Sequence, residues 1–174
     1  MNFVLIQFIG AIGYSLLAYS YFKKEKRQIL FMQIIAYIMF TIHYYLLSGI
    51  TGAICNLIGL IALIAIYLFD KYKWKYKNIM ASIFVIVLLV INIVTFQNAY
   101  SIFPLIASII VIISFMTDNE HLIRAIGVIA AVCWLIYAIV YRSYIGTVFE
   151  VITLIGVVIA FIRSEKEKRI LNKN

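Results

Sequence analysis

The sequence predicts an all-α integral membrane protein of seven transmembrane helices, with its N-terminus outside and its C-terminus inside. Three observations lead to this fold class. Of the 174 residues, 66% are apolar and 13% are charged, and the mean hydropathy is +1.06, whereas a soluble domain is about 45–50% apolar and about 25% charged. The basic residues cluster between apolar runs. The chain also resembles itself at an offset of 94 residues, which predicts two parallel repeats of three helices joined by one further helix.

Seven apolar runs are candidate membrane spans. A helix needs about 20 residues to cross about 30 Å of hydrocarbon, and each run comes close to that length. The first run has no basic segment before it and no small-residue cleavage site, so we expect a membrane helix there and not a signal peptide. The runs cover residues 3–22, 28–47, 52–69, 78–96, 101–117, 122–141 and 145–162.

The distribution of Lys and Arg predicts the orientation. With the N-terminus outside, 14 of the 15 basic residues fall in cytoplasmic loops or the C-terminal tail, as the positive-inside rule requires. Arg142 alone lies outside; we expect it to snorkel at the interface, and attraction of an anionic solute is the alternative. The net charge of +8 therefore reflects loops beside a lipid bilayer, and we expect no nucleic-acid partner.

The 94-residue offset aligns the first three spans with the last three. Gly52 aligns with Gly146 and Asn56 with Glu150, and no gap is needed along the whole alignment. Because the first and fifth spans enter from the same side, the two triplets have the same orientation and the fourth span serves as the inverter. The expected units are residues 1–71, a linker helix at 72–98, and residues 99–174 including a basic cytoplasmic tail.

Glu150 is the strongest candidate site residue because it is the only acidic residue inside a predicted span. A carboxylate at mid-membrane costs about 2.5 kcal/mol or more, so it should face protein or a water-filled cavity. We expect a solute or proton site; a structural carboxyl, protonated or paired with a hydroxyl, is the alternative. Its repeat mate Asn56 is the second candidate, against the alternative of an ordinary interhelical hydrogen bond.

Further candidates follow from their position in the repeat. Phe40 and Trp134 are also 94 residues apart and are expected to offer stacking surface to a solute, unless they serve only in packing. His43 lies one turn beyond Phe40 and either gates the outer mouth, shares a proton with Glu150 or is a polar interfacial residue. Gly10 aligns with Pro104, the only proline, and this pair is a candidate hinge.

The segments "SGITGAICNLIG", "CWLIYAIVYRSYIGTVFEVI" and "IFPLIASII" resemble the YgjV-type bacterial inner-membrane proteins over nearly the whole chain. This resemblance implies a multi-pass protein of the bacterial plasma (inner) membrane. A more distant resemblance is to the SWEET and SemiSWEET transporters. Those families line the solute site with a tryptophan and, sixteen residues later, an asparagine; Phe40 with Asn56 and Trp134 with Glu150 stand at this spacing. Phenylalanine and glutamate are the two departures.

Together these features favour a transporter of a small polar solute, sugar-like or cationic, by alternating access and with a proton as one candidate coupling ion. The alternative is a non-transporting receptor or accessory protein on the same fold, as the resemblance of this fold to KDEL receptors implies. We expect no enzyme, because one acid without a partner is not a catalytic set. Cys55 and Cys133 show no metal-ligand or disulfide spacing, so no metal and no cofactor are expected. A homo-oligomer is left open.

The orientation is testable by cysteine accessibility. We expect Ser48→Cys to react with a membrane-impermeant thiol reagent added outside intact cells, and Lys75→Cys to react only after the cells are opened, because the first position precedes the third span and the second follows it. Labelling in the reverse pattern would overturn the predicted orientation.

Overall fold

The computed structural model describes residues 2–20, 22–23, 25–73, 75–114, 116 and 120–171. Within these residues the chain forms seven α-helices, one 3-10 helix and no strand, so the predicted all-helical class is confirmed for them. The helices are α1 (Phe3–Ser20), α2 (Lys26–Leu46), α3 (Ile50–Tyr72), α4 (Lys77–Val94), η1 (Ala99–Ser101), α5 (Ile102–Ser114), α6 (Glu120–Val140) and α7 (Tyr144–Leu171).

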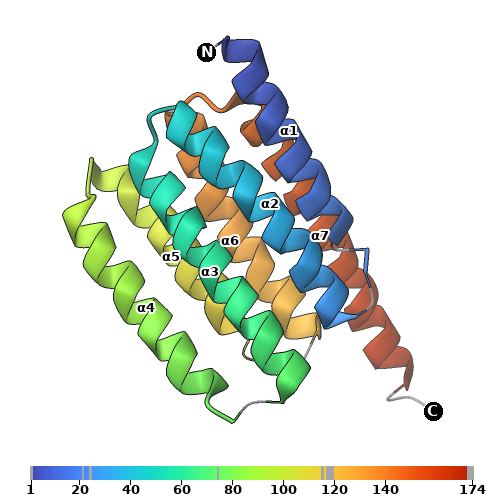
Figure 1. The fold of residues 1–174 in the computed structure, drawn as a ribbon. Coiled ribbons are helices and arrows are strands. Elements are labelled where there is room, and N and C mark those ends of the chain that lie inside the picture. The colour runs from blue at the N-terminus through green and yellow to red at the C-terminus, as the bar shows by residue number, and fades with distance from the viewer. Residues whose placement is uncertain are drawn as a thin grey trace.

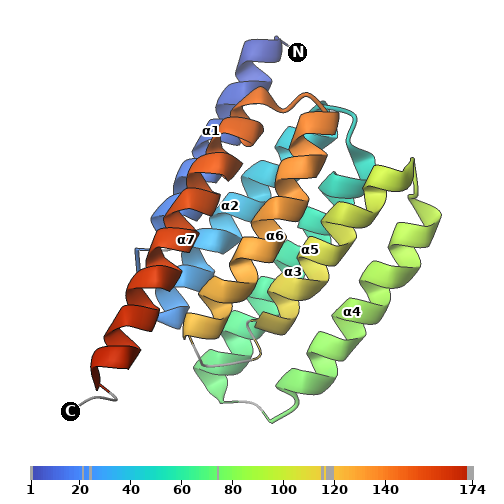
Figure 2. The same ribbon diagram turned by 180° about the vertical axis from the view of Figure 1, so that it is seen from behind.

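Six of the helices form a closed ring. Helix α2 packs between α1 and α3, and α6 packs between α5 and α7. The ring closes where α1 contacts α7 and where α3 contacts α5. Helix α4 packs against α3 and α5 and lies at the edge of the bundle (Figures 1 and 2). Each contact within the first triplet therefore has a counterpart in the second, and so has each contact between them.

The two ends of the bundle differ in charge. One end, here called the outer end, carries the N-terminus and the turns α2–α3, α4–α5 and α6–α7 (Figure 1). The opposite or inner end carries the connections α1–α2 and α3–α4 and the C-terminal end of α7. The basic clusters at 23–27 and 71–77 belong to these inner connections. The bundle thus gathers positive charge at one end, and the membrane side which that end faces stays a prediction.

The helices differ in how well they match a membrane span. Helices α1, α2 and α3 are long and apolar enough to cross a bilayer, whereas the apolar parts of α4 to α7 within the described residues are 10–17 residues long. Helix α7 itself runs to Leu171, beyond the predicted end at residue 162, so the described part of the basic tail continues the helix. The predicted span at 101–117 lies partly outside the described residues, and the tail residues 172–174 lie wholly outside them.

The helix boundaries keep the offset seen in the sequence. Helices α2 and α6 begin at Lys26 and Glu120, and α3 and α7 begin at Ile50 and Tyr144; both pairs are 94 residues apart. An apolar segment would remain apolar if its helix began several residues earlier or later. The residue at which a helix begins depends instead on the local backbone conformation. The agreement therefore indicates that corresponding segments fold alike locally, while the superposition of whole triplets stays a prediction.

The turns that precede α3 and α7 explain this agreement. Ser48 and Arg142, 94 residues apart, both adopt the left-handed backbone region, with φ of 61° and 53°. The next residue, Gly49 or Ser143, donates its amide hydrogen to the carbonyl five residues earlier at 2.9 Å in both turns. This 6→1 bond and the left-handed residue are the features of a Schellman-type helix end. Both triplets thus reverse direction between their second and third helices in the same way.

Glycines at the outer end allow helices from different triplets to approach. Gly52, in the first turn of α3, lies against the Tyr137 ring of α6, and a Cβ at this position would overlap that ring. The Gly52 amide donates to the Tyr137 hydroxyl at 2.9 Å. Amides in the first turn of a helix have no carbonyl partner in their own helix, so the phenol satisfies a group that the bilayer would otherwise leave unpaired.

This close contact predicts that Gly52→Ala destabilises the fold by about 1–3 kcal/mol, as overpacking of a filled site does. Gly156→Ala is the matched control, because a Cβ there meets no atom within 4 Å. Thermal unfolding of the detergent-purified protein should show a lower midpoint for Gly52→Ala only. Equal midpoints for the two variants would show that the α3–α6 contact tolerates an added methyl group.

Candidate functional site

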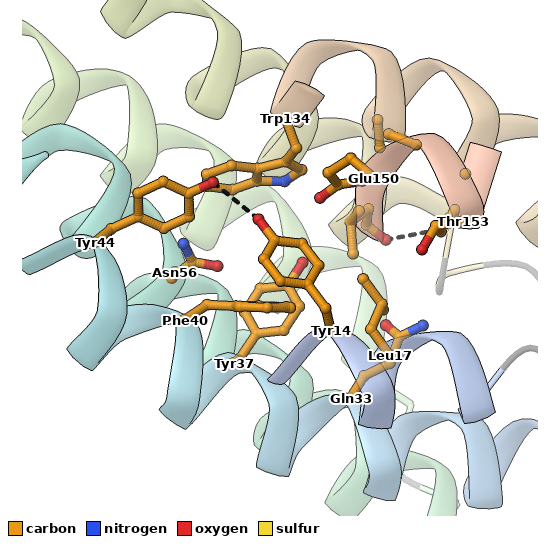
Figure 3. Close-up of a pocket in the computed structure, with 15 residues that line it drawn as sticks. Tyr14, Leu17, Gln33, Tyr37, Phe40, Tyr44, Asn56, Trp134, Glu150 and Thr153 are labelled. Carbon is orange, nitrogen blue, oxygen red and sulfur yellow. Dashed lines mark hydrogen bonds between the residues drawn. The ribbon is translucent and has the colours of Figure 1, made fainter. Parts of the chain in front are cut away.

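A cavity lies at the centre of the ring and is lined by residues from α1, α2, α3, α5, α6 and α7 (Figure 3). Measured by the space open to the centre of a water-sized sphere, its volume is about 40 Å³. One ordered water needs about 10–15 Å³ on this measure, so the cavity has room for roughly three waters. Its wall combines five aromatic side chains (Tyr14, Tyr37, Phe40, Tyr44 and Trp134) with five polar ones (Gln33, Asn56, Ser114, Glu150 and Thr153).

Glu150 extends from α7 into this cavity. The residue is 3% exposed, and its carboxyl group faces the indole of Trp134 and the phenol of Tyr14 (Figure 3). No side chain in the described part of the chain donates a hydrogen bond to this carboxyl group or forms an ion pair with it. A carboxyl group buried at this depth is costly, so its neutralising partner is a proton or something that enters the cavity.

Asn56 reaches the same cavity from α3. It is 1% exposed, and its amide nitrogen donates to the Gly52 carbonyl at 2.9 Å. This bond holds the amide so that its oxygen faces the centre of the cavity (Figure 3). The two repeat-matched residues Asn56 and Glu150 therefore lie at one cavity, whereas their part in binding a solute stays a prediction.

Phe40 and Trp134 also line the cavity, each within a pair of aromatic rings. The ring centroids of Phe40 and Tyr14 are 4.6 Å apart, and those of Trp134 and Tyr44 are 5.5 Å apart in a stacked arrangement. The hydroxyl groups of Tyr14 and Tyr44 are hydrogen-bonded at 3.0 Å and connect the two pairs. The result is a continuous aromatic wall that runs from α1 across α2 to α6 (Figure 3).

The sequence did not identify the tyrosines of this wall, because the chain has 13 tyrosines and most occur in spans or at their ends. A signal was present in the glycines. A Cβ at Gly13 would lie 2.8 Å from the Phe40 ring, and one at Gly59 would lie 2.6 Å from the Tyr37 ring. Glycines in the middle of a span thus mark where large rings pass an adjacent helix.

The cavity extends from the level of Asn56 and Glu150 toward the inner end. Gln33 lies in the second turn of α2 and Ser114 is the last residue of α5, so both lie near the inner ends of their helices. Gln33 donates to the Ser20 hydroxyl at 3.4 Å. The Thr153 hydroxyl is buried and has no hydrogen-bond partner among the described residues. Polar groups thus continue on the inner side of the aromatic wall.

His43 does not line the cavity. It is fully buried, with Nδ1 2.9 Å from the Ile6 carbonyl oxygen on α1 and Nε2 2.7 Å from the Ser143 hydroxyl before α7. Because both ring nitrogens have partners on the outer side, the structure places His43 at the outer closure and away from the Glu150 carboxyl group. A role for His43 as a gate stays a prediction.

Tyr137 occupies the position 94 residues after His43 and makes the matching contact. His43 on α2 bonds to Ser143 at the start of α7, and Tyr137 on α6 bonds to Gly52 at the start of α3. We refer to these two hydrogen bonds, His43–Ser143 and Tyr137–Gly52, as the outer latches. Both join one triplet to the other on the outer side of the cavity. The offset from His43 was the sequence signal for Tyr137.

The two candidate hinge residues have local explanations. Helix α1 is continuous through Gly10, where a Cβ would lie 2.7 Å from the His43 ring, so the glycine makes room for the imidazole. Pro104 is in the first turn of α5, directly after the 3-10 helix Ala99–Ser101. A missing amide hydrogen costs little at that position. A hinge role for either residue stays a prediction.

These features define an all-helical membrane protein with a cavity at its centre that is lined by aromatic and polar side chains. The sequence matches the Imp-YgjV family, described as bacterial inner membrane proteins, over residues 4–168. The chain therefore belongs to the YgjV-type family, and the predicted location in the bacterial inner membrane is confirmed. Comparison with curated proteins and with solved structures yields no match.

The outer latches predict an effect of Ser143→Ala. Removing the hydroxyl leaves the buried Nε2 of His43 without a partner, which costs about 1–3 kcal/mol. Ser82→Ala is the control, because Ser82 is exposed and its hydroxyl bonds only to the Asn78 carbonyl of its own helix. Thermal unfolding should show a loss for Ser143→Ala and no change for Ser82→Ala. A loss of the same size in both would contradict the latch.

Proposed function

We propose that this protein is a transporter of a small polar solute that works by alternating access. Two triple-helix bundles, α1–α3 and α5–α7, enclose the solute, and α4 links them across seven membrane spans. The observation that carries this proposal is the central cavity, whose most polar groups, Asn56 and Glu150, come from corresponding positions of the two bundles. Transport sites of repeat-built membrane proteins lie at such an interface.

The closure of the cavity supports a definite direction of opening. On the outer side the two bundles are joined by the outer latches, each a single hydrogen bond, by the Ile145 amide donating to the Gln7 side-chain oxygen at 3.1 Å, and by the hydroxyl groups of Thr51 and Ser101 at 3.3 Å. A hydrogen bond contributes about 0.5–1.5 kcal/mol net, so this small set of contacts keeps the outer side closed but still able to open. Rocking of the bundles would break both latches at once, because they occupy corresponding positions.

Four cavity residues and the two candidate hinge residues have roles in this mechanism. The Asn56 oxygen accepts a hydrogen bond from the solute, and the Glu150 carboxyl group accepts hydrogen bonds, neutralises a cationic group or carries a coupling proton. Phe40 and Trp134 provide stacking surface. Gly10 and Pro104 allow the first helix of each bundle to bend as the bundles move.

The second candidate is a non-transporting receptor or accessory protein on the same fold. The small volume of the cavity, about 40 Å³, and the hydrogen bonds that join the bundles on its outer side favour this alternative. Such a protein has no need for the cavity to open toward both sides in turn. The two functions therefore differ in whether the cavity becomes less accessible from one side of the membrane when it becomes more accessible from the other.

The test uses Ala131→Cys, a cavity position, in a chain whose Cys55 and Cys133 are replaced by serine. We expect a membrane-impermeant thiol reagent to label it from the inner side faster than from the outer side. Replacing His43 and Ser143 by alanine should raise labelling from the outer side and lower it from the inner side, because one opening excludes the other.

Lys75→Cys in the same background is the control, because it lies in the exposed connection between α3 and α4 and its labelling should not depend on the latches. For a transporter, loss of the His43–Ser143 bond must raise the labelling of Ala131→Cys from the outer side and lower it from the inner side. If the latch variant raises outer labelling and leaves inner labelling unchanged, the bundles do not alternate and the receptor is the better description.

A further inference from the structure

The charge of the cavity wall selects among solutes. Glu150 is the only acidic lining side chain, and no lysine, arginine or histidine lines the cavity within the described residues. An anionic solute would add a second negative charge to a site at which the described residues place no cation. A neutral solute would leave the carboxyl group to be neutralised by a proton. A cation supplies the missing charge directly, and pairing is how buried charges are tolerated in membranes.

The aromatic wall favours an organic cation over a bare metal ion. Five rings, from Tyr14, Tyr37, Phe40, Tyr44 and Trp134, border the cavity. Ring faces attract ammonium groups within about 6 Å of the centroid. Hard metal ions instead take about six to eight oxygen ligands, and no group of three or more His, Cys, Asp or Glu side chains that could hold a metal occurs in the described part of the chain.

The free acceptors favour an ammonium group that still carries hydrogens. The Asn56 oxygen faces the cavity, and its amide nitrogen is already bonded to Gly52. The Thr153 hydroxyl is buried without a partner among the described residues. The Glu150 carboxyl group accepts no hydrogen bond from them either. A protonated primary amine has three N–H donors for these acceptors, whereas a quaternary ammonium ion has none.

We infer that the cavity binds a small protonated primary amine, with its ammonium group between the Glu150 carboxyl group and the faces of Trp134 and Tyr14. This inference rests on the proposed function and specifies the class of solute. The apolar part of the amine lies toward Phe40 and Tyr37, and Asn56 and Thr153 accept the remaining ammonium hydrogens. The volume of the cavity limits the apolar part to a few carbon atoms unless the bundles separate.

The test compares four probes of similar size by thermal unfolding of the purified protein. Propylammonium and tetramethylammonium are added as chlorides, propionate as its sodium salt and 1-propanol as the neutral alcohol, all at equal ionic strength. A ligand that binds only the folded protein raises the unfolding midpoint with its concentration. We expect a concentration-dependent rise with propylammonium, a smaller rise with tetramethylammonium, and none with 1-propanol or propionate.

Variants identify the groups responsible. Glu150→Gln keeps the size of the side chain and loses the charge, so it should weaken propylammonium binding at least tenfold, an effect of about 1.4 kcal/mol; Glu150→Asp should retain part of the affinity. Trp134→Leu removes one of the two rings placed against the ammonium group and should weaken binding by about 2- to 30-fold, the range that one cation–π contact provides. Ser82→Ala, far from the cavity on α4, should respond like the wild type.

Each other outcome overturns the inference in a recognisable way. Equal stabilisation by 1-propanol and propylammonium, retained in Glu150→Gln, would mean a neutral solute at the same cavity and would leave the proposed function intact. Stabilisation by sodium or potassium chloride alone, to the same extent, would indicate an inorganic cation. Absence of any shift, with reciprocal labelling of Ala131→Cys still observed, would leave a transporter of another solute class. If Glu150→Gln does not fold, the probe series on the wild type and Trp134→Leu decides.

Discussion

A carboxyl group without a donor can be buried inside a membrane bundle only where water, a proton or a bound cation meets it. Glu150 places this constraint on the rest of the structure. The helix that carries it cannot pack on that face against an apolar neighbour without a large penalty, so the six helices leave a small cavity at this position within an otherwise apolar core. The aromatic wall then keeps this space narrow, and the polar residues on its inner side keep it wettable.

The two triplets have similar backbone turns but different side chains at corresponding positions. The turns before α3 and α7 have the same hydrogen bonds and the same left-handed residue, 94 residues apart. The side chains at corresponding positions nevertheless differ: asparagine against glutamate at the cavity, and histidine against tyrosine at the outer latches. Similar backbones give the two triplets complementary contacts, and the differences confine the one cavity carboxyl group to the second triplet. The cavity therefore has a polarity that two identical triplets would lack.

Small residues make this arrangement sterically accessible. The rings of Tyr37, Phe40 and His43 each pass over a glycine of an adjacent helix, at Gly59, Gly13 and Gly10. Any side chain at these positions would move the rings, and the rings form both the cavity wall and one latch. Helix association in a membrane depends on close packing of this kind, because lipid offers apolar groups as good an environment as another helix does.

The sequence by itself determined the helical membrane class, the approximate position of every helix and the 94-residue offset, because apolar runs and basic loops report directly on the solvent around each segment. It also led to Glu150, Asn56, Phe40 and Trp134, which line the cavity, since a polar residue in a span and its repeat mate are visible without coordinates. Only the tertiary structure decided that Tyr14 and Tyr44 join the wall and that His43 bonds to Ser143 outside the cavity. Those contacts depend on how each helix is rotated and on which helix it meets, and in a chain that is apolar on almost every face the pattern of residues does not define the rotation.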